Sequence, residues 1–224
     1  MPSASENVIW VEYSFFCVYV FFLGFRLGLI RRFRFLHLYL FCAVCASLVD
    51  GLVLRVFGLT SPAYFHCYLY LDLLLSLALY LVIVELYRLN LPRNVWRHSW
   101  PIFVAIPVLL ISLSVVAAHE YATHRLLHFS IVLSEYVFFA SLALMFVLWG
   151  ISRMTVRDSG IAARMIHAWA VYFLLFGLVY SARHLSVLYL YSYSNIAMAV
   201  ARVYAAWLPV ALGYAMVNGL EFGV

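Results

Sequence analysis

The fold class that this sequence predicts is an all-α, polytopic membrane protein, a bundle of seven transmembrane helices. The first observation is composition: of 224 residues, 67% are hydrophobic and 10% are charged, with a mean hydropathy of +1.02. A soluble domain carries about 25% charged residues, and a chain this apolar could not cover its surface in water, so its solvent must be lipid. The second observation is a series of seven apolar segments, each near the ~20 residues that a bilayer crossing requires. The third is an uneven distribution of arginine between alternate connections, which is typical of membrane topology.

The seven segments are expected to form one bundle over residues 1–224, because their connections leave no room for a separate soluble domain. Short connections also predict that neighbouring helices are antiparallel and adjacent. The residues before the first segment lack a basic stretch and no cleavage site follows that segment, so no removable signal peptide is expected. In chain order, the expected spans are residues 8–30, 35–57, 63–87, 101–118, 126–151, 161–187 and 195–217.

Individual segments carry features that separate them from plain apolar helices. The second holds a CxxC pair, Cys42 and Cys45. Since no charge lies beside these thiols to lower their pKa, we expect them to serve in packing rather than in redox or metal chemistry. The third opens with a group of tyrosines and holds Asp72, and the fourth is short and contains Pro107.

Arginine predicts the orientation, because cytoplasmic loops carry the excess of basic residues. All 14 basic residues are arginine. The even connections hold one of them, Arg125, which lies close to Glu120. We therefore expect the odd connections and the C-terminus in the cytoplasm and the N-terminus outside. The arginines of the odd connections are Arg31, Arg32, Arg34, Arg88, Arg93, Arg97, Arg153 and Arg157.

Ionisable residues within the spans are the main candidates for a site, because each is costly in hydrocarbon and normally faces the bundle interior, a partner or water. The expected topology places most of them in the outer half of the bundle. A pair between Asp72 and either Arg183 or Arg202 would neutralise both charges. Two interpretations remain open, inert ties between helices or a polar pocket that holds a ligand or ion. The candidate residues of this buried polar network are Asp50, Asp72, Glu135, Arg183, Arg202, Tyr68 and Tyr180.

Two helical stripes are expected to face inward. On the third segment, residues four apart lie on one slowly drifting face. That stripe consists of Tyr64, Tyr68, Asp72, Ser76 and Tyr80. The matching stripe on the sixth segment consists of Trp169, Phe173, Phe176, Tyr180 and Arg183.

Histidine supplies the alternative metal candidates, His119, His124 and His128. The spacing of the first two is one residue too long for HExxH, and no further His-rich box accompanies them. His124 and His128 are four residues apart, so they could share a metal ion if both lie on one helix. His66 and His184 lie at matching depths, as haem ligation on facing helices would require. The cofactor stays undetermined.

Several function classes are excluded. A chain without lysine cannot hold retinal through a Schiff base, and an arginine guanidinium stays protonated and forms no imine. The arginines are spread over short loops rather than clustered as in a nucleic-acid-binding domain, so no nucleic-acid partner is expected. There is no GxSxG nucleophile motif and no glycine-rich nucleotide loop. The expected partners are the lipid bilayer and a further membrane protein.

Two stretches carry a family resemblance: YFHCYLYLDLLLSLALYLVIVELYRLNLPR and LSEYVFFASLALMFVLWGISRMTVRDSGIAARMIHAW. The chain resembles a group of small, uncharacterised multi-pass membrane proteins abundant in acidobacteria. The resemblance covers about a third of the chain and implies the topology but no activity. Asp72 departs from the pattern, in which a glutamate is expected.

The sequence therefore predicts a multi-pass protein of the bacterial inner membrane. Its expected role is non-enzymatic: to bind a small ligand, a lipid or a partner protein as a sensor or as an accessory subunit of a membrane complex. One alternative is a small proton- or ion-coupled transporter that uses Asp72, Glu135 and Arg202. A second alternative is a metal- or haem-dependent membrane oxidoreductase.

Overall fold

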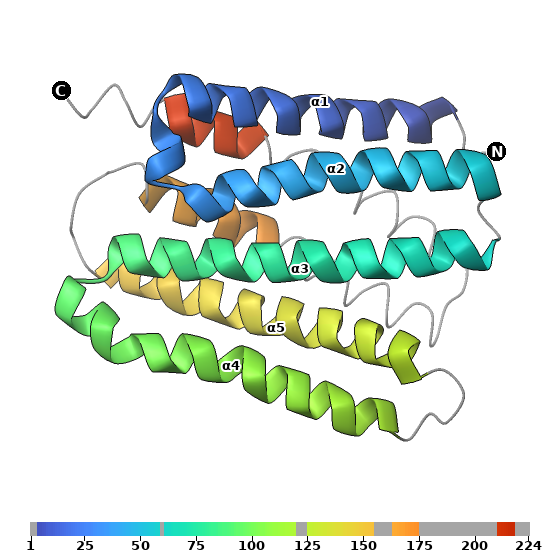
Figure 1. Ribbon diagram of the computed structural model, residues 1–224. Helices are drawn as coiled ribbons and strands as arrows, with labels where there is room; N and C mark the ends of the chain where they lie inside the picture. The colour runs from blue at the N-terminus through green and yellow to red at the C-terminus, as the bar shows by residue number, and fades with distance from the viewer. Residues whose placement is uncertain (1–3, 59–60, 120–124, 155–162, 175–209, 218–224) are drawn as a thin grey trace. The chain divides into compact units, whose positions relative to one another are not determined.

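The computed structural model describes residues 4–58, 61–119, 125–154, 163–174 and 210–217, and the regular elements in these ranges are all helical (Figure 1). Four helices are long and apolar enough to cross a membrane, which confirms the all-α class and the expectation of a multi-pass membrane protein. These helices are α2 (Arg34–Phe57), α3 (Pro62–Asn90), α4 (Arg93–His119) and α5 (Arg125–Met154).

The chain divides into two compact units. The first unit contains the short 3₁₀ helix η1 (Leu29–Arg31), α2, α3, α4 and the part of α5 up to Leu144. The second unit contains α1 (Ala4–Arg26), the remainder of α5 and the helical stretches 163–174 and 210–217. Each unit is described by itself below.

The helices α2 and α3 form an antiparallel pair in the first unit (Figure 1). Gly58 ends α2 with a φ of 78°, a left-handed conformation that glycine adopts without a steric penalty. Ser61 then starts α3: its hydroxyl accepts the backbone N–H of Tyr64 at 3.1 Å, and Pro62 occupies the first helical turn, where its missing N–H is not needed. The end of α2 and the start of α3 thus carry local stop and start signals.

The second half of α3 forms the core of the first unit. Over the segment 78–87 nearly every side chain is buried, including the polar Tyr80, Glu85 and Tyr87. Over the segment 62–77, by contrast, many side chains are exposed. This contrast means that α3 is enclosed by its neighbours in one half only.

A proline in α4 explains one contact between α4 and α3. Pro107 lies inside α4 and has no N–H to donate to the carbonyl of Phe103, four residues earlier. In hydrocarbon that carbonyl needs another donor. The hydroxyl of Tyr80 on α3 provides it, at 2.7 Å from the Phe103 oxygen. The proline therefore creates a specific attachment point for the neighbouring helix.

The helix α5 contacts α3 through polar groups at two levels. The hydroxyl of Tyr87 donates to the carbonyl of Leu144 at 2.7 Å. Ten or eleven residues earlier on each helix, the hydroxyls of Ser76 and Ser134 lie 3.1 Å apart. Since both contacts advance in the same direction along the chain, α3 and α5 run parallel in this unit.

In the second unit, aromatic and small residues carry the packing. Trp169 and Phe173 are fully buried, with ring centroids 6.0 Å apart. Gly213 packs near α1, since a Cβ added to it would lie in van der Waals contact with Cγ2 of Val20, at 3.4 Å. The remaining members of the expected stripe on the sixth segment, Phe176, Tyr180 and Arg183, lie outside the described residues.

The observed bounds agree with the expected spans for α2, α3 and α5 to within a few residues. The fourth span differs, because α4 begins at Arg93 instead of residue 101. Its first two turns are polar and aromatic, so they were not part of the apolar segment, yet they continue the same helix. The first helix, α1, ends at Arg26 instead of residue 30. Two residues later, Gly28 adopts a φ of 66°.

Candidate functional site

A short chain of polar side chains joins α3 to α5. The Ser134 hydroxyl donates to Oδ2 of Asp72 at 2.5 Å, and the Ser76 hydroxyl lies 3.1 Å from that of Ser134. Both serines are buried, whereas the side chain of Asp72 is exposed. The chain therefore begins between two helices and ends at a carboxylate on their surface. We call these three residues the polar chain.

Depth makes this carboxylate unusual. Asp72 lies ten residues after Pro62 and eighteen before Asn90, which at 1.5 Å per residue is about 15 Å and 27 Å from the ends of α3. A carboxylate at such a depth in a candidate membrane span is costly unless a proton, a cation or a hydrogen-bond donor compensates it. In the part of the chain that the structure describes, Asp72 makes no ion pair.

A second acid lies beside the polar chain. Glu135 follows Ser134 on α5, is partly exposed and interacts electrostatically with Asp72. Two neighbouring carboxylates repel each other when both are ionised, so a proton or a cation that they share is favoured. The polar chain and Glu135 thus offer only oxygen atoms to a bound group.

The other sequence-predicted residues fall into two groups. Asp50 on α2 is partly buried and accepts a long hydrogen bond of 3.5 Å from Tyr64, which ties α2 to α3 but leaves Asp50 outside the polar chain. In the stripe expected on the third segment, Ser76 and Tyr80 are buried, whereas Tyr68 is 48% exposed. Tyr180, Arg183 and Arg202 lie outside the described residues, and their pairing with Asp72 stays a prediction.

In the described part of the structure, the histidine candidates do not form a cluster. His119 is exposed at the end of α4, His128 is partly buried in α5, and His124 lies outside the described ranges. Within the described ranges, no group of three or more histidine, cysteine, aspartate or glutamate side chains could hold a metal ion. His66 is exposed in the first turns of α3. None of the four cysteines forms a disulfide.

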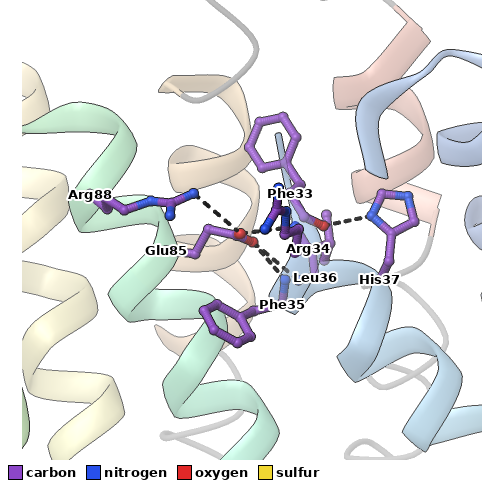
Figure 2. A network of polar contacts seen from close by, with 7 residues as sticks. All are labelled: Phe33, Arg34, Phe35, Leu36, His37, Glu85 and Arg88. Carbon is purple, nitrogen blue, oxygen red and sulfur yellow. Dashed lines mark hydrogen bonds and ion pairs between the residues drawn. The ribbon is translucent and has the colours of Figure 1, made fainter. Parts of the chain in front are cut away.

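Sequence reasoning missed the network around Glu85, which Figure 2 shows. The residue before α2, Phe33, has no side chain that could cap a helix, so the first N–H groups of α2 need another acceptor. The buried carboxylate of Glu85 on α3 accepts three of them, at 2.8 Å from Arg34, 3.0 Å from Phe35 and 3.3 Å from Leu36. The carboxylate thus caps a neighbouring helix.

Two further groups complete this network. A guanidinium nitrogen of Arg88 lies 3.9 Å from Oε1 of Glu85, with the arginine side chain 47% exposed. The ring of His37 donates from Nδ1 to the carbonyl of Phe33 at 2.6 Å, which fixes the proton on that nitrogen. A negative charge at a helix N-terminus is also favourable through the helix dipole. We therefore assign the Glu85 network to structure rather than to ligand binding.

Comparison with known proteins adds no assignment: no protein-family model, no curated protein and no solved structure matches this chain.

Proposed function

We propose that this protein is a non-enzymatic membrane protein that binds a small ligand at the polar chain, as a sensor or an accessory subunit of a membrane complex. The ligand carries a cationic or hydrogen-bond-donating group that meets Asp72. The observation that supports this proposal is the carboxylate of Asp72, a residue exposed inside a candidate span, which accepts the hydroxyl of the buried Ser134 at 2.5 Å.

The chemistry of the polar chain favours binding over catalysis. The Ser134 hydroxyl donates a hydrogen bond to Asp72, and the Ser76 hydroxyl lies within hydrogen-bond distance of Ser134. The hydroxyls thereby orient one carboxylate oxygen and leave the other side of the carboxyl group to a ligand. Among the described residues no histidine hydrogen-bonds to either serine, and the sequence contains no lysine, so neither group is there to activate the serines as nucleophiles.

The same proposal includes the membrane arrangement. We propose seven spans, with the N-terminus outside and the C-terminus in the cytoplasm of a bacterial inner membrane. Exposed arginines at the start of α2, the end of α3 and the start of α4 support the cytoplasmic placement of that end. The helical stretches 163–174 and 210–217 lie inside the expected sixth and seventh spans.

Non-denaturing mass spectrometry of the protein extracted from its native membrane tests the binding site. The wild-type protein is expected to retain a small-molecule mass, and Asp72→Asn is expected to lose it. Ser130→Ala is the matched control, since Ser130 is a buried serine on α5, the helix of Ser134, and its hydroxyl donates to the Leu126 carbonyl of that helix at 2.9 Å. This control should retain the mass.

The free energy of unfolding distinguishes a ligand-binding role of Asp72 from a structural tie between helices. The amide of Asp72→Asn can still accept the Ser134 hydroxyl, so we expect the free energy of unfolding to change by no more than about 1 kcal/mol. If Asp72 instead neutralises a buried arginine, the loss is about 3–5 kcal/mol. A loss of that size, or a wild-type protein that retains no small molecule, would contradict the binding proposal.

A second candidate function is proton- or ion-coupled transport, which the electrostatic interaction between Asp72 and Glu135 favours. Neighbouring acids in membrane spans mark proton relays. In reconstituted vesicles with a pH gradient, a pH-sensitive dye should report proton flux that Asp72→Asn and Glu135→Gln abolish and Ser130→Ala retains. Equal dye responses in all four proteins would remove transport from consideration.

A further inference from the structure

One end of the first unit carries a concentration of exposed arginines. They come from η1 and the start of α2, from the end of α3 and from the start of α4. Each has an exposed side chain. We call this set the arginine surface: Arg31, Arg32, Arg34, Arg88, Arg93 and Arg97.

The contacts of the first unit bring these elements together. The Glu85 carboxylate joins the start of α2 to the end of α3, since its Oε1 accepts the backbone N–H of Arg34 and lies 3.9 Å from Arg88 (Figure 2). The start of α4 packs on the same end, because the rings of Tyr87 and Trp96 lie 4.8 Å and 5.3 Å from that of Phe103. Three elements therefore meet at one end of the unit.

Among the described residues, no exposed acidic side chain lies near the arginine surface to neutralise it. The nearest acid, Glu85, is only 2% exposed and its carboxylate already accepts three backbone N–H groups. The next acid on α2, Asp50, lies sixteen residues beyond Arg34, about 24 Å along the helix. The arginine surface thus keeps a net positive charge for an external partner.

Tryptophan indicates the depth of the surface. Trp96 and Trp100 lie one helical turn apart among the α4 arginines, with ring centroids 5.5 Å apart, and Trp100 is 49% exposed. Exposed tryptophans are enriched where a membrane meets water, at the level of the lipid headgroups. The arginine surface therefore lies at headgroup level, next to phosphate groups.

From this placement we infer that the arginine surface binds the phosphate headgroups of anionic phospholipids in the adjoining leaflet. Guanidinium groups donate two parallel hydrogen bonds to a phosphate, which makes arginine the preferred phosphate ligand. Basic clusters next to membrane helices also attract anionic lipid by about 1 kcal/mol per residue. This inference does not depend on the polar chain or on its proposed ligand.

Lipid titration of the purified full-length protein in detergent tests the inference. Phosphatidylglycerol and phosphatidylcholine are added separately, and non-denaturing mass spectrometry counts the bound lipids. The wild type is expected to bind phosphatidylglycerol more tightly than phosphatidylcholine. Arg93→Gln/Arg97→Gln should lower the affinity for phosphatidylglycerol about fivefold for each arginine removed, with no change for phosphatidylcholine.

The matched control is Arg55→Gln, an exposed arginine at the opposite end of α2, which should leave the lipid preference unchanged. Arg31→Gln/Arg32→Gln supplies a second variant on another element, in case the α4 variant does not fold. Equal wild-type affinities for the two lipids, or an equal loss in Arg55→Gln, would overturn the inference. Displacement of the lipid by water-soluble glycerol phosphate at similar concentration would also overturn it, in favour of a site for soluble phosphate.

Discussion

Among single residues, Glu85 has the clearest structural role. Its carboxylate is buried and accepts the first three N–H groups of α2, which would otherwise have no acceptor because Phe33 cannot cap the helix. Because Glu85 is buried, water does not readily replace these hydrogen bonds in the folded protein. Asp72 differs, because its carboxylate is exposed and accepts a single side-chain hydroxyl.

Removal of the Glu85 carboxylate should destabilise the protein. We expect Glu85→Ala to lower the free energy of unfolding by about 2–4 kcal/mol, because three N–H groups lose their acceptor in a buried position. Glu85→Gln keeps one acceptor oxygen and should cost roughly half as much. Denaturant unfolding in detergent, followed by circular dichroism, measures both.

Arg88→Gln is the control for this prediction. The guanidinium of Arg88 is half-exposed and 3.9 Å from Glu85, so its removal should change stability by less than about 1 kcal/mol. If Glu85→Ala and Arg88→Gln had equal effects, the ion pair and not the helix cap would be the stabilising interaction.

At the scale of the elements, α4 shows how a local defect becomes a specific contact. Pro107 removes the intrahelical donor of the Phe103 carbonyl, and the Tyr80 hydroxyl of α3 replaces it at 2.7 Å. Other polar contacts of α3 involve no such defect: the hydroxyls of Tyr87 and Ser76 reach the Leu144 carbonyl and the Ser134 hydroxyl of α5. Polar side chains thus tie α3 to its neighbours where lipid gives no hydrophobic drive for association.

A double-mutant cycle tests the compensation between Pro107 and Tyr80. Tyr80→Phe alone should cost about 1 kcal/mol, because it leaves the Phe103 carbonyl without a donor. In a Pro107→Ala background the restored N–H satisfies that carbonyl, so Tyr80→Phe should cost much less. Unfolding free energies of the four proteins give the coupling. Strictly additive effects would show that the two residues act independently.

At the scale of the whole molecule, four apolar helices support a multi-pass membrane protein. The ends of the α2–α3 pair differ in charge. The end with η1 and the start of α4 is rich in exposed arginine, whereas the connection between α2 and α3 has a single nearby one, Arg55. Such asymmetry is what orients helices during membrane insertion.

Cysteine labelling tests the orientation that follows from this asymmetry. In a variant without native cysteines, Ala63→Cys places an exposed thiol at the start of α3, and Asn94→Cys places one at the start of α4, next to the end of α3. A membrane-impermeant maleimide added to intact cells should label Ala63→Cys and should label Asn94→Cys only after permeabilisation. The reverse pattern would place the arginine-rich end outside.

The sequence was most informative about features that depend on local composition. The bounds of α2 follow from an apolar segment ended by Gly58, but the start of α4 was missed because its first two turns are polar. Asp72 and Ser76 were expected on one face, whereas Ser134 was not singled out. The buried serines of α5 gave a signal, since Ser130, Ser134 and Ser141 recur at near-helical spacing.

Contacts between distant residues could not be read from local patterns. Glu85 and Arg34 are 51 positions apart, and only the lack of a capping residue before α2 hinted that a distant acceptor was needed. Likewise, the partner of Asp72 on α5 depends on how parallel helices align. The expected partners Arg183 and Arg202 lie outside the described residues and stay predictions.

The Glu85 cap has a consequence for how the chain is made. Arg34 leaves the ribosome 51 residues before Glu85, so α2 enters the membrane while its first turn still lacks its acceptor. During that interval water or lipid headgroups at the membrane surface must satisfy those N–H groups. The start of α2 therefore reaches its final bonding only when α3 has been inserted beside it.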